Sequence, residues 1–154
     1  MDRMFTLEEA NALIPRVIAA FARTTQLVAS ARRIAWRLAA AGVRPERPGQ
    51  LPDPALVAHD PALAADLALA TSLASAALDE AKALEALGIH VRDVERGLID
   101  FRSIVDGQRE VWLCWELGER EVGYWHDLSA GYVGRRPVTG HRFFRSRQLS
   151  APQE

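Results

Sequence analysis

Apolar side chains in two parts of the chain recur at the three- and four-residue spacing of an amphipathic helix. In the first part, residues 6–41, a series of apolar or small side chains recurs every seven residues: Leu7, Ile14, Phe21, Val28 and Ala35. Thr6 and Glu9 have the spacing of a capping box, which predicts the first turn of a helix, and Gly42 predicts its end. We therefore expect one long helix over 6–41.

A second helix is predicted over residues 61–87. Residues 43–60 precede it and form a proline-rich connector that cannot continue the first helix. Asp60 followed by Pro61 is typical of a helix start, and Gly88 is typical of a helix end. Alanine is abundant along the apolar stripes of both helices, which favours a closely packed antiparallel hairpin.

From Ile89 onward the apolar period changes to two residues, which is typical of strands. The alternation predicts strands over 97–105, 108–117 and 121–127, with 89–92 as a fourth. Residues 89–138 would thus hold a β-meander and, at their end, a turn rich in glycine and arginine. These elements predict an α+β fold, in which a long two-helix antiparallel hairpin packs on a three- to four-stranded antiparallel β-meander.

The turn at Asp106 and Gly107 sets the expected register of the first two long strands, because this dipeptide is typical of a two-residue hairpin loop. With such a loop Val105 pairs with Gln108, and Asp100 lies opposite Leu113. Both faces of the sheet then carry many apolar side chains, whereas one helical hairpin can cover only one face. The uncovered face predicts a homodimer, in which two-fold pairing buries it.

Composition places the chain among small globular proteins. It has 154 residues, a formal net charge of −1 and 49% apolar residues, which predicts a single domain over 1–154. The single cysteine, Cys114, excludes an internal disulfide framework and cysteine-rich zinc modules, and it favours a reducing compartment. We expect a cytoplasmic protein without a membrane span, since charged residues interrupt the alanine-rich stretches.

Several motifs in the second half of the chain occur in a distinctive order. They are Gly88-Ile89-His90-Val91-Arg92-Asp93, Gly97-Leu98-Ile99-Asp100-Phe101, Leu113-Cys114-Trp115-Glu116-Leu117-Gly118-Glu119, Tyr124-Trp125-His126 and Gly131-Tyr132-Val133-Gly134-Arg135-Arg136-Pro137. Together with Phe5-Thr6-Leu7-Glu8-Glu9-Ala10-Asn11, they make the chain resemble the bacterial family known as domain of unknown function 2203 over residues 4–138. The resemblance implies a domain identity but no activity.

His126 is the first candidate for chemistry, because an imidazole can ligate a metal and titrates near neutral pH. In the expected register it shares a face with Asp100 two strands away, at about 9–10 Å, a gap that suits a water, a small ligand or a divalent metal. Glu116 could join His126 and Asp100 only if both faces of the sheet contributed. The alternative is a half-buried structural histidine that is bonded to the backbone.

The turn that begins at Gly131 is the second candidate. Its two glycines precede Arg135 and Arg136, a pattern that resembles an anion-binding turn, and Arg135 could complete a ligand wall with His126 and Asp100. The alternative is a plain turn whose arginines pair with Asp100 or Asp127. Cys114 is a poor candidate nucleophile, because a thiol in the middle of an apolar strand behaves as a small apolar group.

The sequence leaves three functions open. It favours a homo-oligomeric structural or partner-binding module, because no convergent catalytic set is visible. The alternative is a small-ligand or metal-dependent enzyme with a site around His126, Asp100 and Arg135. The third is nucleic-acid binding through the basic tail, residues 139–154, which the net charge of −1 disfavours.

Overall fold

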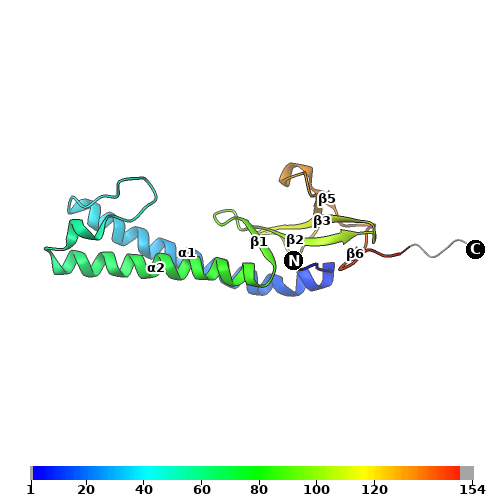
Figure 1. Ribbon diagram of the computed structural model, residues 1–154, viewed down its shortest axis with the longest axis horizontal. Coiled ribbons are helices and arrows are strands. Elements are labelled where there is room, and N and C mark those ends of the chain that lie inside the picture. Colours follow the sequence, from blue (N-terminus) through cyan, green and yellow to red (C-terminus); the bar gives the residue numbers. More distant parts are fainter. Residues whose placement is uncertain (1, 150–154) are drawn as a thin grey trace, which may run out of the picture. The chain divides into compact units, whose positions relative to one another are not determined.

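The computed structural model describes residues 2–149, so that the end of the predicted tail, residues 150–154, lies outside the described residues. Its helices and strands confirm the predicted α+β class (Figure 1). The elements are α1 (Leu7–Ala40), α2 (Pro61–Ala86), β1 (Ile89–Asp93), β2 (Leu98–Val105), β3 (Arg109–Glu116), β4 (Tyr124–Asp127), β5 (Arg136–Pro137) and β6 (Phe143–Phe144). Two short 3-10 helices, Pro54–Val57 and Tyr132–Gly134, lie in the connecting segments.

The predicted helix starts are confirmed by side-chain caps. The Thr6 hydroxyl accepts a hydrogen bond from the Glu9 backbone N–H at 3.1 Å, and the Glu9 carboxylate accepts one from the Thr6 N–H at 3.3 Å. This reciprocal pair is the predicted capping box. At α2, Asp60 Oδ1 accepts from the backbone N–H groups of Ala62 and Leu63 at 3.1 and 3.2 Å. Both helices therefore begin where local side-chain chemistry predicts.

The chain divides into two compact units, and α1 and α2 each contribute residues to both. The unit Ala22–Ala81 holds the distal part of the helical hairpin and the connector between the helices. Its own apolar cluster consists of Ile34, Leu38, Val43, Val57, Leu67 and Ala70. Ion pairs join its two helices, from Arg23 to Glu80 at 2.8 Å and from Arg37 to Asp66 at 3.4 Å.

The other unit, Met1–Phe21 with Lys82–Glu154, holds the sheet. Its strands follow the order β1-β2-β3-β4-β5, every pair of these strands is antiparallel, and β6 pairs with β2. The four predicted strands are confirmed. The two-residue strands β5 and β6 were not predicted, because they are too short to show an alternation. The part of the tail that the structure describes thus folds onto its own chain, where Phe143 is buried.

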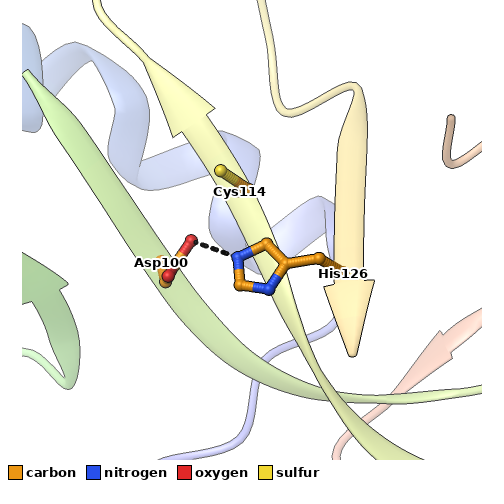
Figure 2. A group of neighbouring side chains, drawn as sticks. All are labelled: Asp100, Cys114 and His126. Atoms are coloured by element: carbon orange, nitrogen blue, oxygen red, sulfur yellow. Dashed lines mark hydrogen bonds and ion pairs between the residues drawn. The ribbon is translucent and has the colours of Figure 1, made fainter. Parts of the chain in front are cut away.

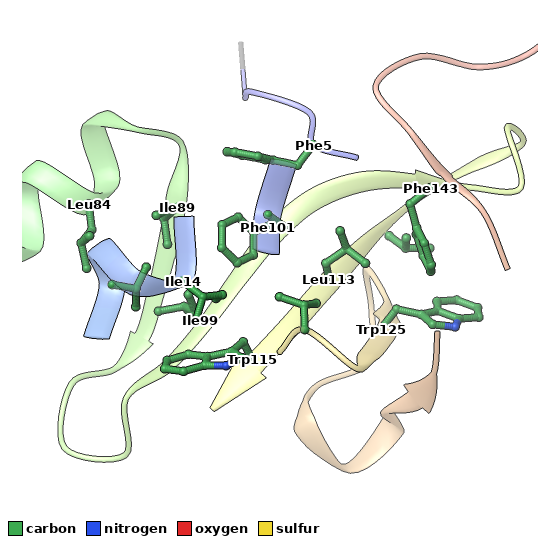
Figure 3. Close-up of a cluster of buried hydrophobic side chains, with 14 of the residues drawn as sticks. Phe5, Ile14, Leu84, Ile89, Ile99, Phe101, Leu113, Trp115, Trp125 and Phe143 are labelled. Atoms are coloured by element: carbon green, nitrogen blue, oxygen red, sulfur yellow. The ribbon is translucent and has the colours of Figure 1, made fainter. Parts of the chain in front are cut away.

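One face of the sheet carries the main hydrophobic core. The first turns of α1 and the end of α2 pack against it within this unit (Figure 3). The cluster includes Phe5, Ile14, Phe21, Leu84, Ile89, Ile99, Phe101, Val105, Val111, Leu113, Trp115, Val122, Trp125 and Phe143. Leu113 and Trp115 are each 0% exposed.

The register of β2 and β3 differs from the prediction by one residue. Asp106 and Gly107 do form a turn with positive φ angles of 52° and 73°, but the ladder resumes at Val105 opposite Arg109. Gln108 is therefore one extra residue beside the turn. Asp100 consequently lies opposite Cys114, and the predicted pairing of Asp100 with Leu113 is wrong.

This shift moves every β3 side chain to the other face relative to β2. The core face then carries apolar side chains almost exclusively. The opposite face is mixed, because Asp100, Arg102, Glu110 and Glu116 share it with the buried Leu98, Ile104 and Trp112. The expectation of two equally apolar faces is therefore corrected to one apolar and one mixed face. On the mixed face the guanidinium groups of Arg92 and Arg102 lie over the ring of Trp112, at 4.6 and 4.9 Å from its centroid. Two arginines of the same chain thus cover the Trp112 ring on this face.

Helix α2 is unusually apolar for its exposure. By length and composition it is able to cross a membrane, with a mean hydropathy of 1.4 over an 18-residue window of which 17% is buried. One such helix among the described residues is only a weak indication of a membrane protein. Because only 17% of the window is buried, most of this nearly uncharged helix surface is exposed.

Candidate metal centre

Three side chains that are common metal ligands meet on the mixed face of the sheet. Asp100 comes from β2, Cys114 from β3 and His126 from β4 (Figure 2). Antiparallel pairing places Asp100 opposite Cys114, while His126 lies opposite Trp112. The three residues are 3%, 1% and 3% exposed, and their ligand atoms lie within 4.8 Å of one another. The register therefore builds a buried carboxylate, thiol and imidazole cluster, here called the Asp-Cys-His trio.

His126 and Asp100 are much closer than the sequence predicted. Their side chains meet directly, with Nε2 at 3.2 Å from Oδ1, so the expectation of a gap too wide for a direct hydrogen bond is wrong (Figure 2). The strands that carry them are separated by β3, on which Asp100 is opposite Cys114 and His126 is opposite Trp112. The imidazole and the carboxylate thus meet diagonally across β3, beside the small side chain of Cys114.

The hydrogen bonds of His126 define how its ring is protonated. Nδ1 lies 3.0 Å from the backbone carbonyl oxygen of Asp127. A carbonyl oxygen only accepts, so Nδ1 donates its proton there. In a neutral ring Nε2 then carries a lone pair, and it faces a carboxylate oxygen that also only accepts. The pair requires either a second proton on His126 or a cation that both atoms can bind.

The charges of the pair stabilise each other despite burial. Burial raises the pKa of Asp100, but its bond with His126, the histidine's charge and the bond from Arg92 outweigh this effect, so the net pKa lies below the usual value. Burial lowers the pKa of His126, but Asp100 and the backbone carbonyl of Asp127 raise it above the usual value. Both shifts favour the charged forms, an imidazolium beside a carboxylate.

Cys114 is a protonated thiol in this state. Burial raises its pKa to about 12, and the negative charge of Asp100 adds to the rise, whereas Arg135 opposes it. Its sulfur lies within 4.8 Å of the Asp100 carboxylate. As a free thiolate nucleophile Cys114 is therefore disfavoured, which agrees with its low standing as a nucleophile in the sequence.

Arg92 approaches the trio from β1. The ladder between β1 and β2 is irregular between Val91 and Asp93, so that Arg92 is the residue left out of the pairing. Such bulges redirect a side chain and are common beside functional sites. Arg92 Nε donates to Asp100 Oδ2 at 3.0 Å, and the carboxylate is thus bonded on both oxygens.

A cavity of about 350 Å³ opens above the trio. All three members of the trio line it, together with Arg92, Leu98, Trp112, Leu128, Ala130, Gly131 and Tyr132. Tyr132 is held at the rim by two arginines, since the guanidinium groups of Arg96 and Arg135 lie over its ring at 4.5 and 4.6 Å from the centroid. The buried cluster is therefore accessible to a small molecule.

The other predicted site residues lie around this cavity without lining it. Arg135 pairs with Glu119 at 2.5 Å and lies between the rings of Tyr124 and Tyr132, 4.2 and 4.6 Å from their centroids. Arg136 pairs with Asp127 at 3.3 Å. Both arginines thus have acidic partners, although the partner of Arg135 is not Asp100.

Glu116 lies on the same face as Asp100, because the register places it two residues beyond Cys114. It pairs with Arg96 at 3.2 Å, and Arg96 in turn lies over the ring of Tyr132, so Glu116 supports the rim and does not join the trio.

Sequence reasoning missed two residues of this site, Cys114 as a ligand and Arg92. The signal for Cys114 was the segregation of polarity: only the shifted register separates an apolar face from a mixed one. No local pattern signals the bulge at Arg92, because it depends on the pairing of β1 with β2.

Comparison with known proteins identifies a family but no function. The family model described as Uncharacterized conserved protein (DUF2203) matches residues 3–138. No curated protein and no solved structure matches the chain. The match includes both helices, the strands β1 to β5 and the whole Asp-Cys-His trio.

Proposed function

The chain belongs to the DUF2203 family, whose description assigns no activity, and we propose that it is a metalloprotein that binds one divalent transition metal, in the first instance zinc. The ligands are Asp100 Oδ1, Cys114 Sγ and His126 Nε2. The observation that carries the proposal is the facing pair of acceptor atoms, Nε2 and Oδ1 at 3.2 Å, beside a buried thiol.

The donor set and its spacing suit zinc. Carboxylate oxygen, thiolate sulfur and imidazole nitrogen are the three side-chain ligands that zinc uses in proteins, at about 2.0–2.3 Å. Tetrahedral bonds of that length hold ligand atoms roughly 3.3–3.7 Å apart. His126 and Asp100 are already at 3.2 Å, and all three atoms lie within 4.8 Å. Side-chain rotations that move the ligand atoms by about 1 Å are therefore enough to bring them to the spacing of a tetrahedral site.

The surroundings have the features of a built metal site. A histidine that ligates through one nitrogen commonly donates its other N–H to a carbonyl, as His126 does to Asp127. Asp100 is oriented in the same way by Arg92. Metal binding would release the thiol proton of Cys114, since a coordinating thiol is deprotonated. A reducing compartment such as the cytoplasm would keep that thiol available.

Three protein ligands leave one coordination position, and all three line a cavity from which a further ligand could approach. Structural zinc sites use four protein ligands, whereas catalytic sites keep a position for water or substrate. The proposed centre therefore belongs to the open class, in which the metal takes up an exchangeable ligand.

The competing account is a purely structural ion pair. Zinc retention distinguishes this account from a metal site. Tag-free protein is equilibrated with zinc and desalted, and the zinc that remains bound is measured. We expect about one zinc per chain by mass spectrometry for the wild type, and loss of zinc in Cys114→Ala, Asp100→Asn and His126→Gln. His59→Gln, which changes an exposed histidine, is the matched control and keeps its zinc.

Circular dichroism is used to check that each variant is folded. A folded wild type that retains no zinc contradicts the proposal, and so does equal retention in all the variants. In either case the trio is a structural ion pair, and His126→Gln should then mainly lower the unfolding midpoint.

A second candidate function is self-association through α2. Between residues 61 and 78 the single charged side chain is Asp66, which pairs with Arg37 within the hairpin. Leu69 and Leu78 are 51% and 56% exposed on the same stretch. We propose that a second copy of the chain covers this uncharged surface as a helix bundle, because small side chains let helices approach closely. The protein would then be a homodimer, as the sequence favoured, but through its helices and not its sheet.

Light scattering tests the dimer. We expect twice the chain mass of 17.0 kDa at micromolar concentration, and a monomer for the double variant Leu69→Glu with Leu78→Glu. Leu117→Glu, at a site that is 48% exposed on the other unit, is the control and stays dimeric. A wild-type monomer contradicts the proposal. Flotation with lipid vesicles would instead assign the surface to a membrane.

A further inference from the structure

The cavity above the Asp-Cys-His trio has the chemistry of a small-anion site. We infer that it binds a small molecule with a carboxylate or phosphate group, that Arg92 holds this group, and that one of its oxygens completes the coordination of the metal. The inference rests on the proposed function for the metal, and it adds the class of ligand and the residue that selects it.

Arg92 is fixed and also partly free. Its Nε is bonded to Asp100, and its guanidinium carbon lies over the Trp112 ring at 4.6 Å from the centroid. These two contacts hold the group in place. Its Nη1 and Nη2 atoms form no hydrogen bond to any residue from 2 to 149, and the side chain is 41% exposed. Two parallel N–H donors therefore remain for a ligand, which is the geometry that binds a carboxylate or phosphate in bidentate fashion.

Arg92 lies at a bulge in β1, where the pairing passes from Val91 opposite Ile99 to Asp93 opposite Leu98 and leaves Arg92 without a partner in the ladder. Its side chain is on the face that carries Asp100, lines the cavity and bonds to the trio. Because Arg92 takes no part in strand pairing, its contacts are those with Asp100, Trp112 and the cavity.

Charge also favours an anion. Asp100 and the thiolate of Cys114 together neutralise a divalent metal, and Arg92 then leaves one positive charge at the cavity wall. The acid nearest to the rim, Glu116, is already paired with Arg96. An oxyanion would therefore compensate the remaining charge, and a neutral ligand would not.

The size and walls of the cavity limit the ligand to a small molecule. A volume of about 350 Å³ is near the lower end for small-molecule sites, which span roughly 300–1,000 Å³. Trp112, Leu98 and Leu128 supply apolar surface beside the charged group. A ligand with one oxyanion group and a short apolar or aromatic portion matches both parts of the wall.

The test is calorimetric titration of zinc-saturated protein with inorganic phosphate and, separately, with benzoate, at constant ionic strength. We expect saturable binding of at least one of them, and the tighter one shows whether the site prefers phosphate or carboxylate. Arg92→Lys keeps the charge but loses the paired donors, and it should weaken this binding by about tenfold. The matched control is Arg102→Lys, because Arg102 also lies over Trp112 but does not line the cavity. Its affinity should stay within about twofold.

Each outcome has a separate meaning because zinc retention is measured beforehand on the same samples. A chain that retains zinc but binds neither anion below about 10 mM overturns this inference and leaves the metal proposal intact. Equal weakening by Arg92→Lys and Arg102→Lys also overturns it, since binding would then be unspecific attraction. A wild-type chain that retains no zinc overturns the proposed function itself.

Discussion

Replacing Trp115 by alanine tests the sheet register and the position of the core together. Trp115 lies opposite Ile99 on the core face and is 0% exposed, and its Nε1 donates to the Glu119 backbone carbonyl at 3.1 Å. A buried tryptophan removed to alanine costs about 3–5 kcal/mol through lost burial and the cavity that remains. The unpaired carbonyl adds roughly 1 kcal/mol. We expect a loss of about 4–6 kcal/mol, a large part of the 5–15 kcal/mol that is typical of a domain.

Urea unfolding followed by circular dichroism measures this loss. With a denaturant dependence of roughly 2 kcal/mol per molar urea, the midpoint should fall by about 2–3 M. Trp36→Ala is the matched control, because Trp36 is 75% exposed and its removal should change the stability by less than about 0.5 kcal/mol. Equal midpoints for the two variants would refute the assignment of Trp115 to the core face.

Three further predictions concern single positions. Gly97→Ala should destabilise the chain by more than 1 kcal/mol or so, because a Cβ there would lie 2.5 Å from Leu117 Cβ at a φ of +64°, and Gly42→Ala, which has a positive φ but no neighbour within 4 Å, should cost less in the same urea assay. Removal of the hydroxyl in Ser103→Ala should lower the unfolding free energy by about 1–3 kcal/mol, since it donates to the buried carbonyl of Phe5 at 2.6 Å; an unchanged midpoint would contradict the anchoring of the N-terminal segment. The pKa of Asp106 is lowered by hydrogen bonds from the Arg142 backbone and His141. The carboxylate therefore stabilises the folded state fully above the usual carboxyl pKa of about 3.9, and this stabilisation is lost as the pH falls below that value. Asp106→Asn should therefore lower stability near neutral pH and converge with the wild type in acid, and parallel stability curves would exclude this role.

The helices and strands were predictable because their signals are local. The Thr6 and Glu9 capping box and the Asp60 cap each act within one turn of a helix, and the structure shows the bonds that these residues predict. Strand alternation is equally local, so all four longer strands were found. The hairpin turn itself was also predicted, since positive φ angles at Asp106 and Gly107 follow from their residue types.

The site was not predictable to the same degree because it depends on pairing between strands. One extra residue, Gln108, moves the whole of β3 by one position and thereby brings Cys114 to Asp100. The positions of His126 and Asp100 on a common face were inferred correctly. Their direct contact was not, because it runs diagonally across β3 beside Cys114 and depends on how three strands pair. Arg135 was expected at the ligand wall. In the structure its guanidinium pairs with Glu119, a residue in another turn, and this partner could not be inferred from the sequence.

X-ray absorption at the zinc edge tests the central claim most directly, because it identifies the atoms that surround the metal in the loaded protein. The account predicts one sulfur at about 2.3 Å from Cys114, with nitrogen and oxygen neighbours at about 2.0–2.2 Å from His126, Asp100 and one exchangeable ligand. In Cys114→Ala the sulfur contribution should vanish. A zinc shell of nitrogen and oxygen alone in the wild type, unchanged in Cys114→Ala, would show that any bound zinc lies elsewhere and would contradict the account.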